Sequence, residues 1–510
     1  MITATKTGKD IKPLRMPNSV LLTGMLLGFL ADRLWVANGP LGPGFAIWIG
    51  LCGLAAFWTA KRTRAADRSE LGLWCLASFI AALLLSFRTS VPVIMAMLGV
   101  MLATATMVIM QKNGQSLRDI DISDQFVALG RLPKQCLLAT FSVLCKIEVG
   151  ASLLDPRLRA AARGFVLALP VLVIFSLLFA SADAVFDQYL QNAMQLFSTD
   201  TIDHLLIMLV FGWVATGLLA GVSEKHFLVN RQKRQFFDLG TEDTATILGL
   251  ILLLFMVFVS LQISYLFGGQ DTIEATAGLT LADYARRGFF ELLAIAGLTL
   301  ALLTTVAQTN CNRRVFRPLA GLMIACVLIM LLSAGQRMLL YVDAFGLSLD
   351  RLTAVWAMAW IALGLLIFAY TLLRDRKRDF AAGLTLSAIA IAILFALSNP
   401  AAMVAKINID RTLTDGAELD VMYLLTLGSD AAPILIQQIE ALPGSARCQI
   451  AGHAMTRWQG NNSRSNVQLD DWRWHNASTA AAVQHTQKAL PLLTAIDNSC
   501  LNNRRQFFTQ

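Results

Sequence analysis

Residues 91–110 read VPVIMAMLGVMLATATMVIM, a run of twenty residues without a charged side chain. A helix needs about 20 apolar residues to cross the hydrocarbon core of a bilayer, so this run predicts a membrane-spanning helix. The whole chain has the same character: 56% of its 510 residues are hydrophobic and 15% are charged. Soluble proteins have roughly a quarter of their residues charged. Because the mean hydropathy is also high, +0.59, we expect an integral membrane protein.

Apolar runs of similar length recur along the chain and predict eleven crossings. The predicted spans are 18–36, 43–60, 70–87, 91–110, 164–182, 202–222, 245–267, 288–308, 318–336, 352–373 and 380–398. Asp32 and Arg33 interrupt the first span. The basic N-terminus before it resembles the start of a signal peptide, but no small-residue cleavage site follows, so we expect an uncleaved span. The predicted fold class is therefore all-α, a polytopic bundle of about eleven transmembrane helices.

Basic residues fall mainly on one side of the predicted spans. The N-terminal tail and loops 61–69, 111–163, 223–244, 309–317 and 374–379 carry most of the loop Lys and Arg residues. The opposite loops contain only Arg33, Arg88, Arg286, Arg287, Arg337 and Arg351. Cytoplasmic loops are enriched in Lys and Arg, so we predict a cytoplasmic N-terminus and, after eleven spans, an extracytoplasmic C-terminal tail. The same loops explain the net charge of +8 without a nucleic-acid partner.

Composition divides the chain into four predicted parts. Residues 1–117 form a four-span N-terminal membrane section, and 118–163 form a cytoplasmic segment whose apolar spacing suggests amphipathic helices on the membrane surface. Residues 164–398 form a seven-span membrane section. Residues 399–510 are a polar tail, long enough for a small, mainly helical extracytoplasmic domain.

Two of the eight cysteines, Cys448 and Cys500, lie in this tail. An oxidising exterior favours a disulfide between them, which would close a loop of about fifty residues and stabilise the fold by about 3–4 kcal/mol. The alternative is a pair of free thiols. We favour the disulfide because of the predicted compartment.

Polar side chains gather at the predicted outer ends of the spans. AGQRMLLYVDAFGLSLDR (334–351) lies between two apolar runs, and LADYARRGFFELLAIAGL (281–298) carries Glu291 into the eighth span. Arg287 and Glu291 are four residues apart and can pair on one helix face. Arg337 has Glu291 and Asp343 as candidate partners. The predicted outer-leaflet cluster comprises Asp32, Arg33, Asp183, Tyr284, Arg286, Arg287, Glu291, Arg337, Tyr341 and Asp343.

Two interpretations of this cluster stay open. A charge at mid-span costs at least about 2.5–3.5 kcal/mol, so each charge near hydrocarbon needs water or a partner. In the first interpretation, the charges reach the membrane interface from the helix ends, and Arg287 with Glu291 forms an ion pair that fixes packing. In the second, they line a polar pocket that opens outward beneath the C-terminal tail.

Motifs of soluble catalysis are absent from the sequence. There is no phosphate-binding P-loop, no GxSxG, no HExxH and no dinucleotide fingerprint. The tail histidines His453, His475 and His485 lack the close spacing of metal ligands, so we interpret them as surface or hydrogen-bonded residues. No metal and no cofactor is expected.

Several segments together resemble a known family of bacterial multi-pass proteins. They are LLGFLADRLWVANGPLG (26–42), LFASADAVFDQYL (178–190), SLQISYLFGG (260–269), LADYARRGFFELL (281–293), RMLLYVDAFGLSLDRL (337–352), NPAAMVAKINIDR (399–411) and LDVMYLLTLGSDAAP (419–433). They are similar to domain-of-unknown-function family 4173 and its relative 4153. The resemblance ends near Pro433, and nothing recognisable follows from about 440. It implies a bacterial inner-membrane location and supplies no activity.

Three classes of function remain. The first is a non-enzymatic envelope sensor, regulator or assembly partner that acts through its extracytoplasmic side. The second is a secondary transporter in which Glu291 carries a proton or ion and Arg287 or Arg337 holds an anion. The third is a membrane enzyme for a lipid-linked substrate, with Asp183, Glu291 or Asp343 as acid or base. The predicted partners are the lipid bilayer and either an envelope protein or a lipid-linked or small-molecule ligand.

Overall fold

The computed structural model describes residues 16–36, 41–63, 68–111, 117, 120–145, 164, 168, 172, 175–176, 178–195, 199–223, 240–277, 289–307, 309, 312–374, 377–459 and 471–507. The regular elements in these residues are helices, and they contain no strand. Seven described helices are long and apolar enough to cross a membrane: Pro43–Ala60, Val91–Gln111, Asp203–Val222, Thr241–Gln262, Arg313–Phe345, Leu349–Leu373 and Asp379–Leu397. Ser69–Leu85 and Glu291–Ala307 are shorter apolar helices. The chain is therefore a multi-pass helical membrane protein.

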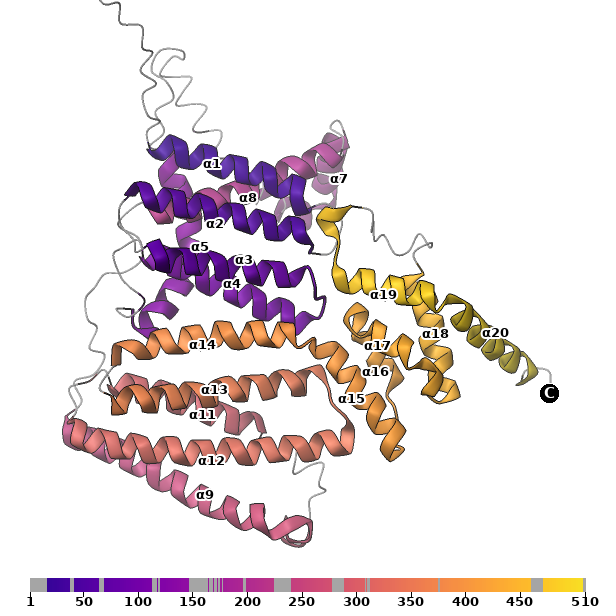
Figure 1. Ribbon diagram of the computed structural model, residues 1–510. Coiled ribbons are helices and arrows are strands. Elements are labelled where there is room, and N and C mark those ends of the chain that lie inside the picture. Colours follow the sequence, from indigo (N-terminus) through magenta and orange to yellow (C-terminus); the bar gives the residue numbers. More distant parts are fainter. Residues whose placement is uncertain are drawn as a thin grey trace, which may run out of the picture.

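The membrane helices form two neighbouring groups (Figure 1). The first contains α1 (Met16–Ala31), which continues into the π-helix η1 (Asp32–Val36), α2 (Pro43–Thr63), α3 (Arg68–Leu85), α4 (Val91–Gln111), α5 (Ile122–Cys145) and α8 (Thr199–Ser223), with α7 (Ala184–Gln195) leading into α8. The second contains α9 (Thr241–Ala277), α11 (Phe289–Ala307), α12 (Arg313–Phe345), α13 (Leu349–Leu373) and α14 (Lys377–Leu397).

Helix α14 joins the two groups. Toward the second group, its Phe380 packs edge-on against Phe368 of α13, with ring centroids 5.0 Å apart. Its Ala382, Ile389 and Ala396 belong to the core that α2, α3 and α4 form in the first group. Apolar side chains of α14 are therefore buried in the cores of both groups.

Helices α1 and α8 meet through glycines. A Cβ on Gly24 would lie 1.9 Å from Thr216 Oγ1, and a Cβ on Gly28 would lie 2.3 Å from Met208 O. Small residues four apart let two helix backbones approach closely, a common packing mode in membranes, where lipid provides little hydrophobic drive for association. The order Gly24–x–x–x–Gly28 on α1 therefore fixes where α8 can lie.

Helix α5 is the described part of the segment predicted to lie on the membrane surface. It packs against α8 so closely that a Cβ on Gly217 would lie 2.2 Å from Cys136 O. Thr140 Oγ1 also donates to Trp213 O at 2.8 Å. Some large apolar side chains of α5, including Phe126 and Leu137, are exposed, whereas others, such as Leu132, are buried. Small and polar residues thus make the closest contacts with α8, and the large apolar residues of α5 are divided between the interior and the surface.

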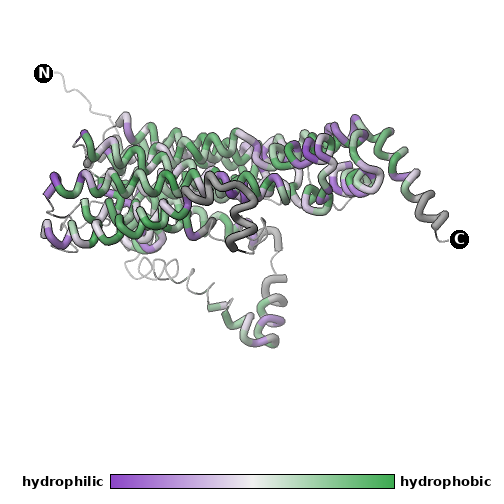
Figure 2. Tube along the Cα trace, turned by 90° about the horizontal axis from the view of Figure 1, so that it is seen from below, coloured by the Kyte–Doolittle hydropathy of each residue, from purple (hydrophilic) through white to green (hydrophobic). Residues whose placement is uncertain are grey.

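The chain continues from α14 into a set of helices at one end of the bundle (Figure 1). These C-terminal helices are α15 (Pro400–Asp415), α16 (Val421–Thr426), η3 (Gly428–Asp430), α17 (Ala432–Gln437), η4 (Ile439–Ala441), α18 (Gly444–Trp458), η5 (Trp472–Trp474), α19 (Ala477–Lys488) and α20 (Leu490–Phe507). Figure 2 shows hydrophobic residues along the bundle and more hydrophilic ones in the C-terminal helices. Their core also includes Leu347 from the α12–α13 turn and Leu352 from α13, so it is continuous with the membrane helices.

Ten of the predicted spans coincide with described helices, and 164–182 lies mostly outside the described residues. The clearest difference concerns AGQRMLLYVDAFGLSLDR. We expected residues 337–351 to form the connection between two spans, but α12 continues through Phe345 and only residues 346–348 are non-helical. Gly346, with φ of 76°, ends the helix and its N–H bonds Val342 O. Met338 is buried along α12, which explains why the helix persists beyond the apolar run.

Candidate functional site

The residues of the predicted outer-leaflet cluster do not all fall within the described chain. Tyr284, Arg286 and Arg287 lie outside it, and so does the predicted Arg287–Glu291 pair. Glu291 is exposed in the first turn of α11. Asp183 is also exposed, and its Oδ1 accepts from Val185 N at 2.7 Å at the start of α7.

The cluster residues on α12 contact the C-terminal side of the molecule. The Arg351 guanidinium carbon lies 4.1 Å from the centroid of the Tyr341 ring. Asp343 has an exposed side chain, and its backbone oxygen accepts from Arg411 Nη2 of α15. Arg337 is half-buried on the same helix.

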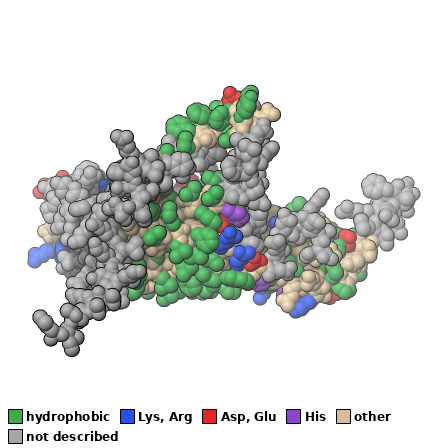
Figure 3. All heavy atoms as spheres, turned by 90° about the horizontal axis from the view of Figure 1, so that it is seen from above, with side chains coloured by type: hydrophobic (Ala, Val, Ile, Leu, Met, Phe, Trp, Pro, Cys, Tyr) green, Lys and Arg blue, Asp and Glu red, His purple; other side chains and the backbone are tan. Residues whose placement is uncertain are grey.

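Asp32 and Arg33 lie in η1 beside α8. The Asp32 carboxylate is buried, with its Oδ1 2.5 Å from Nδ1 of His204 and its Oδ2 3.6 Å from Nε of Arg33. Arg33 extends over Phe29. The surface seen in Figure 3 is largely hydrophobic over the membrane helices, with charged and histidine side chains toward the C-terminal helices. The His204–Asp32 contact thus ties α8 to η1, directly after the end of α1.

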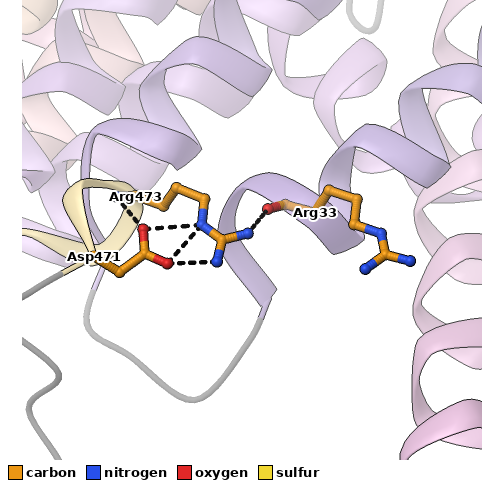
Figure 4. A network of polar contacts seen from close by, with 3 residues as sticks. All are labelled: Arg33, Asp471 and Arg473. Carbon is orange, nitrogen blue, oxygen red and sulfur yellow. Dashed lines mark hydrogen bonds and ion pairs between the residues drawn. The ribbon is translucent and has the colours of Figure 1, made fainter.

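A first joint connects η1 to η5. Arg473 Nη1 donates to the backbone oxygen of Arg33 at 2.6 Å (Figure 4). Arg473 Nε donates to the two carboxylate oxygens of Asp471, at 2.9 and 2.8 Å. The hydrogen bonds from Arg473 lower the pKa of the Asp471 carboxyl below its ordinary value. The carboxylate therefore stays charged and keeps the arginine directed at η1.

A second joint centres on Asp430. Its carboxylate accepts from Thr89 N at 3.0 Å, from Ser90 N at 2.8 Å and from the Ser478 hydroxyl. These donors come from the α3–α4 turn and from α19. Burial lowers the pKa of Arg88 beside it, while the negative charge of Asp430 acts in the opposite direction.

Further hydrogen bonds reinforce the second joint. Asn476 Nδ2 donates to Leu85 O at 3.0 Å, and Ala477 N donates to Ser86 O at 2.8 Å. Arg88 Nε donates to Ala396 O at 2.9 Å, so the end of α14 is tied to the same turn. Backbone groups of a turn, which would otherwise need water, are satisfied by side chains far along the chain.

A third joint connects the α12–α13 turn to α15. Asn408 Oδ1 accepts from Leu347 N, and Asn408 Nδ2 donates to Leu347 O, both at 2.7 Å. Tyr423 of α16 accepts from Leu349 N at 2.7 Å through its hydroxyl. The turn is thus held by amide and phenol side chains from two C-terminal helices.

Beside this third joint lies an open cavity of about 190 Å³. Its lining includes the turn itself, two arginines, two acids and Tyr423. The lining residues are Phe345, Gly346, Leu347, Ser348, Arg351, Asn408, Arg411, Glu418, Leu419, Asp420, Tyr423 and Leu424. The stretch that stood out in the sequence therefore forms both a joint and one wall of a polar cavity, although Arg337, Tyr341 and Asp343 do not line it. We take the three joints and this cavity as the candidate functional site.

In the structure, a disulfide joins Cys448 of α18 to Cys500 of α20, with their Cα atoms 6.0 Å apart. Among the described residues, no group of three or more His, Cys, Asp or Glu side chains is arranged to hold a metal ion. The cavity lining itself combines guanidinium groups with carboxylates, which suits a charged organic ligand.

Sequence reasoning missed Asp430, Asn408, Arg411 and His204 as site residues. A signal for three of them was present, because Asn408 and Arg411 lie in NPAAMVAKINIDR and Asp430 lies in LDVMYLLTLGSDAAP, two segments that carry the family resemblance. Both segments follow the last predicted span. Attention to charges near hydrocarbon alone therefore passed over them.

Comparison with known proteins places the chain in a family. The family model "Domain of unknown function (DUF4153)" matches residues 45–438, well over half of the chain. No curated protein and no solved structure matches the chain. The match runs from α2 to the end of α17, so it includes all residues that line the cavity and leaves α18, α19 and α20 outside. The resemblance to family 4153 is thus confirmed, and that to family 4173 stays a prediction. The chain belongs to the DUF4153 family, whose function is unknown.

Proposed function

We propose that the protein is a non-enzymatic component of the bacterial inner membrane that binds a ligand or partner through its C-terminal helices on the extracytoplasmic side. In this proposal the membrane section has eleven spans, and residues 399–510 act as one binding unit. The N-terminus is cytoplasmic, as the distribution of Lys and Arg indicates. The unit passes information about binding to the membrane helices.

The observation that carries the proposal is the number of fixed joints between the C-terminal helices and the membrane helices. Hydrogen bonds reach the end of η1, the α3–α4 turn and the α12–α13 turn. A domain that is only tethered has a mobile linker and few contacts. Here, a change at the polar cavity would be transmitted directly to α12 and α13, because the cavity shares the α12–α13 turn with them.

The position of the predicted acids supports binding over transport or catalysis. A transporter needs Glu291 in a water-accessible site within the bundle. Glu291 is instead exposed at the first turn of α11, and the cavity at the α12–α13 turn does not include it. Asp183 caps α7 at an exposed position, and the exposed Asp343 does not line the cavity.

Complementation of a deletion strain tests the proposal. Growth of the strain would first be compared with that of its parent under osmotic, detergent and cell-wall antibiotic stress, to find the deletion phenotype. The strain would then receive wild-type protein, Glu291→Gln, or a chain truncated after Leu397, each at matched membrane abundance on immunoblots. We expect Glu291→Gln to restore growth and the truncated chain to fail. Restoration of growth by the truncated chain would contradict the proposal, and failure of Glu291→Gln in the same experiment would favour transport.

A further inference from the structure

The cavity beside the α12–α13 turn has the size of a small-molecule site. Its volume of about 190 Å³ is below the roughly 300–1,000 Å³ typical of sites for drug-sized ligands. It is walled by the end of α12, the start of α13, α15 and α16, and it opens to solvent. A ligand of about the size of an amino acid fits these dimensions.

Two guanidinium groups converge on one side of the cavity, at Gly346. Arg351 Nη1 donates to the backbone oxygen of Gly346, and a Cβ on Gly346 would lie 2.9 Å from Arg411 Nη1. The other hydrogen bonds of these groups go to backbone oxygens of Phe345 and Asp343. A guanidinium has five N–H donors, so each group keeps donors for a ligand. Paired guanidinium donors match the geometry of a carboxylate.

Two carboxylates lie on the lining contributed by the α15–α16 connection. Glu418 and Asp420 are both exposed, and Asp420 Oδ1 caps α16 by accepting from Tyr423 N at 2.9 Å. In the described part of the chain, neither acid forms an ion pair with Arg351 or Arg411. The two guanidinium groups and the two carboxylates therefore line the same cavity without pairing with each other.

The walls of the cavity are fixed before any ligand binds. Gly346 has φ of 76°, and a Cβ there would lie 2.6 Å from Asn408 Oδ1, so the turn accepts no larger residue. Asn408 bonds both backbone groups of Leu347. Burial raises the pKa of Tyr423 above its ordinary value, and nearby acids add to this, while the backbone bond from Leu349 and the charge of Arg351 offset it only in part. Its hydroxyl therefore keeps its proton and can donate to a ligand.

We propose that this cavity binds a small zwitterion, an amino acid or short peptide, with its carboxylate at Arg351 and Arg411 and its ammonium group at Glu418 and Asp420. The proposal rests on the binding function proposed above and names its ligand class. A ligand with one charge would leave either the two arginines or the two acids without a partner.

Binding to the full-length protein in lipid nanodiscs tests the ligand class. The probes are alanine, glutamate, lysine and the dipeptide alanyl-alanine, with propionate as the carboxylate-only analogue, ethylamine as the ammonium-only analogue, and inorganic phosphate. We expect at least one zwitterion to raise the midpoint of thermal unfolding and to give a saturable calorimetric signal. Propionate, ethylamine and phosphate should do neither. Equal binding of propionate or phosphate, or no binding by any zwitterion probe, would overturn the proposal.

Variants locate the site. Glu418→Gln changes an exposed side chain with no backbone role, so the variant should fold. It should raise the Kd about ten- to a hundredfold, because a charged contact with the ligand is lost. Glu440→Gln, an exposed acid away from the cavity, is the matched control and should leave the Kd unchanged. Arg351→Gln should weaken binding at least as much. An unchanged Kd in Glu418→Gln would refute the site, whatever the arginine variant does.

The two proposals fail in distinguishable ways. If no zwitterion binds but the chain truncated after Leu397 still cannot restore growth, the ligand class is wrong and the binding function stands. If the truncated chain restores growth, the binding function is wrong even where a zwitterion binds to the purified protein.

Discussion

Asp430 is 2% exposed and accepts hydrogen bonds from two turn N–H groups and one hydroxyl, each from a part of the chain far from it in sequence. A buried carboxylate is stable only when such donors compensate for its lost hydration. Removing it leaves those donors unsatisfied. One side chain thereby decides whether the second joint forms.

Replacement of Asp430 by Asn should lower the free energy of unfolding by about 1–3 kcal/mol, because the amide offers one acceptor oxygen instead of two and places an NH₂ group against N–H donors. The measurement is thermal unfolding of the purified full-length protein. Asp415→Asn, the same change at an exposed position at the end of α15, is the control and should have little effect. Equal destabilisation by both substitutions would refute the role of Asp430.

His453 should make the C-terminal helices sensitive to acid. Burial, and secondarily the charge of Arg457, lowers its pKa below the ordinary 6.5, and its ring meets Trp458 edge-on. As pH falls through about 6.5, the unfolded chain gains a proton that the folded protein resists, so the free energy of unfolding falls; above this range the effect disappears.

Thermal unfolding measured from about pH 7.5 to about pH 5.5 checks this sign. His453→Gln should flatten the decline at acidic pH, while His475→Gln, at an exposed histidine, should leave it in place. A decline that is identical in wild type and His453→Gln would show that another group is responsible.

At the scale of elements, the contact between α1 and α8 is set by the absence of side chains. A Cβ on Gly28 would lie 2.3 Å from Met208 O and 2.6 Å from Gly212 N, both backbone atoms that cannot move without shifting α8. The same α8 backbone meets α5 at Gly217. Three helices are thus positioned by glycines on α1 and α8, with His204 and Asp32 closing one end of the α1–α8 pair.

Gly28→Ala should therefore destabilise the protein by about 1–3 kcal/mol through overpacking, although alanine is the better helix former. Gly99→Ala on α4 is the matched control, since a Cβ there meets no atom within 4 Å, and it should be neutral or slightly stabilising. Thermal unfolding of both variants in the same detergent provides the comparison. A Gly28 variant as stable as the Gly99 variant would contradict this packing.

For the whole molecule, the property that most affects the proposed function is the side of the membrane that the C-terminal helices face. The turns predicted to be extracytoplasmic after α1, α3 and α12 all contact the C-terminal helices. These three turns, which the sequence predicts to be on the same side of the membrane, therefore lie at the same end of the bundle.

Alkaline phosphatase fusions in a bacterial host test which side that end faces. A fusion after Leu397 should be active, because the enzyme folds only outside the cytoplasm. A fusion after Leu373, at the end of α13 and just before α14 begins, should be inactive. Green fluorescent protein fused at the same position should be fluorescent. The reverse pattern would invert the proposed orientation.

Hydropathy and charge along the sequence were sufficient to predict a helical membrane protein and the positions of most helices. Insertion of a span depends on the apolar content of about 20 consecutive residues, which is a local property. The polar residues of the site could be recognised only in part, since Glu291 and Asp183 stand out in the sequence yet are exposed at helix starts in the structure. These acids stood out because they lie next to apolar runs in the sequence. That position does not indicate which residues surround them in the folded protein.

The sequence by itself determined the class of protein, the positions of most membrane helices and the alternation of basic loops, because each follows from short runs of residues. Only the tertiary structure decided that Arg473 meets Arg33, that Asp430 meets Thr89, and that Arg351 shares a cavity with Arg411. The first two contacts join residues 440 and 341 positions apart. Such hydrogen bonds depend on how separate helices pack, and that packing is set by glycines and buried side chains distributed over the whole chain.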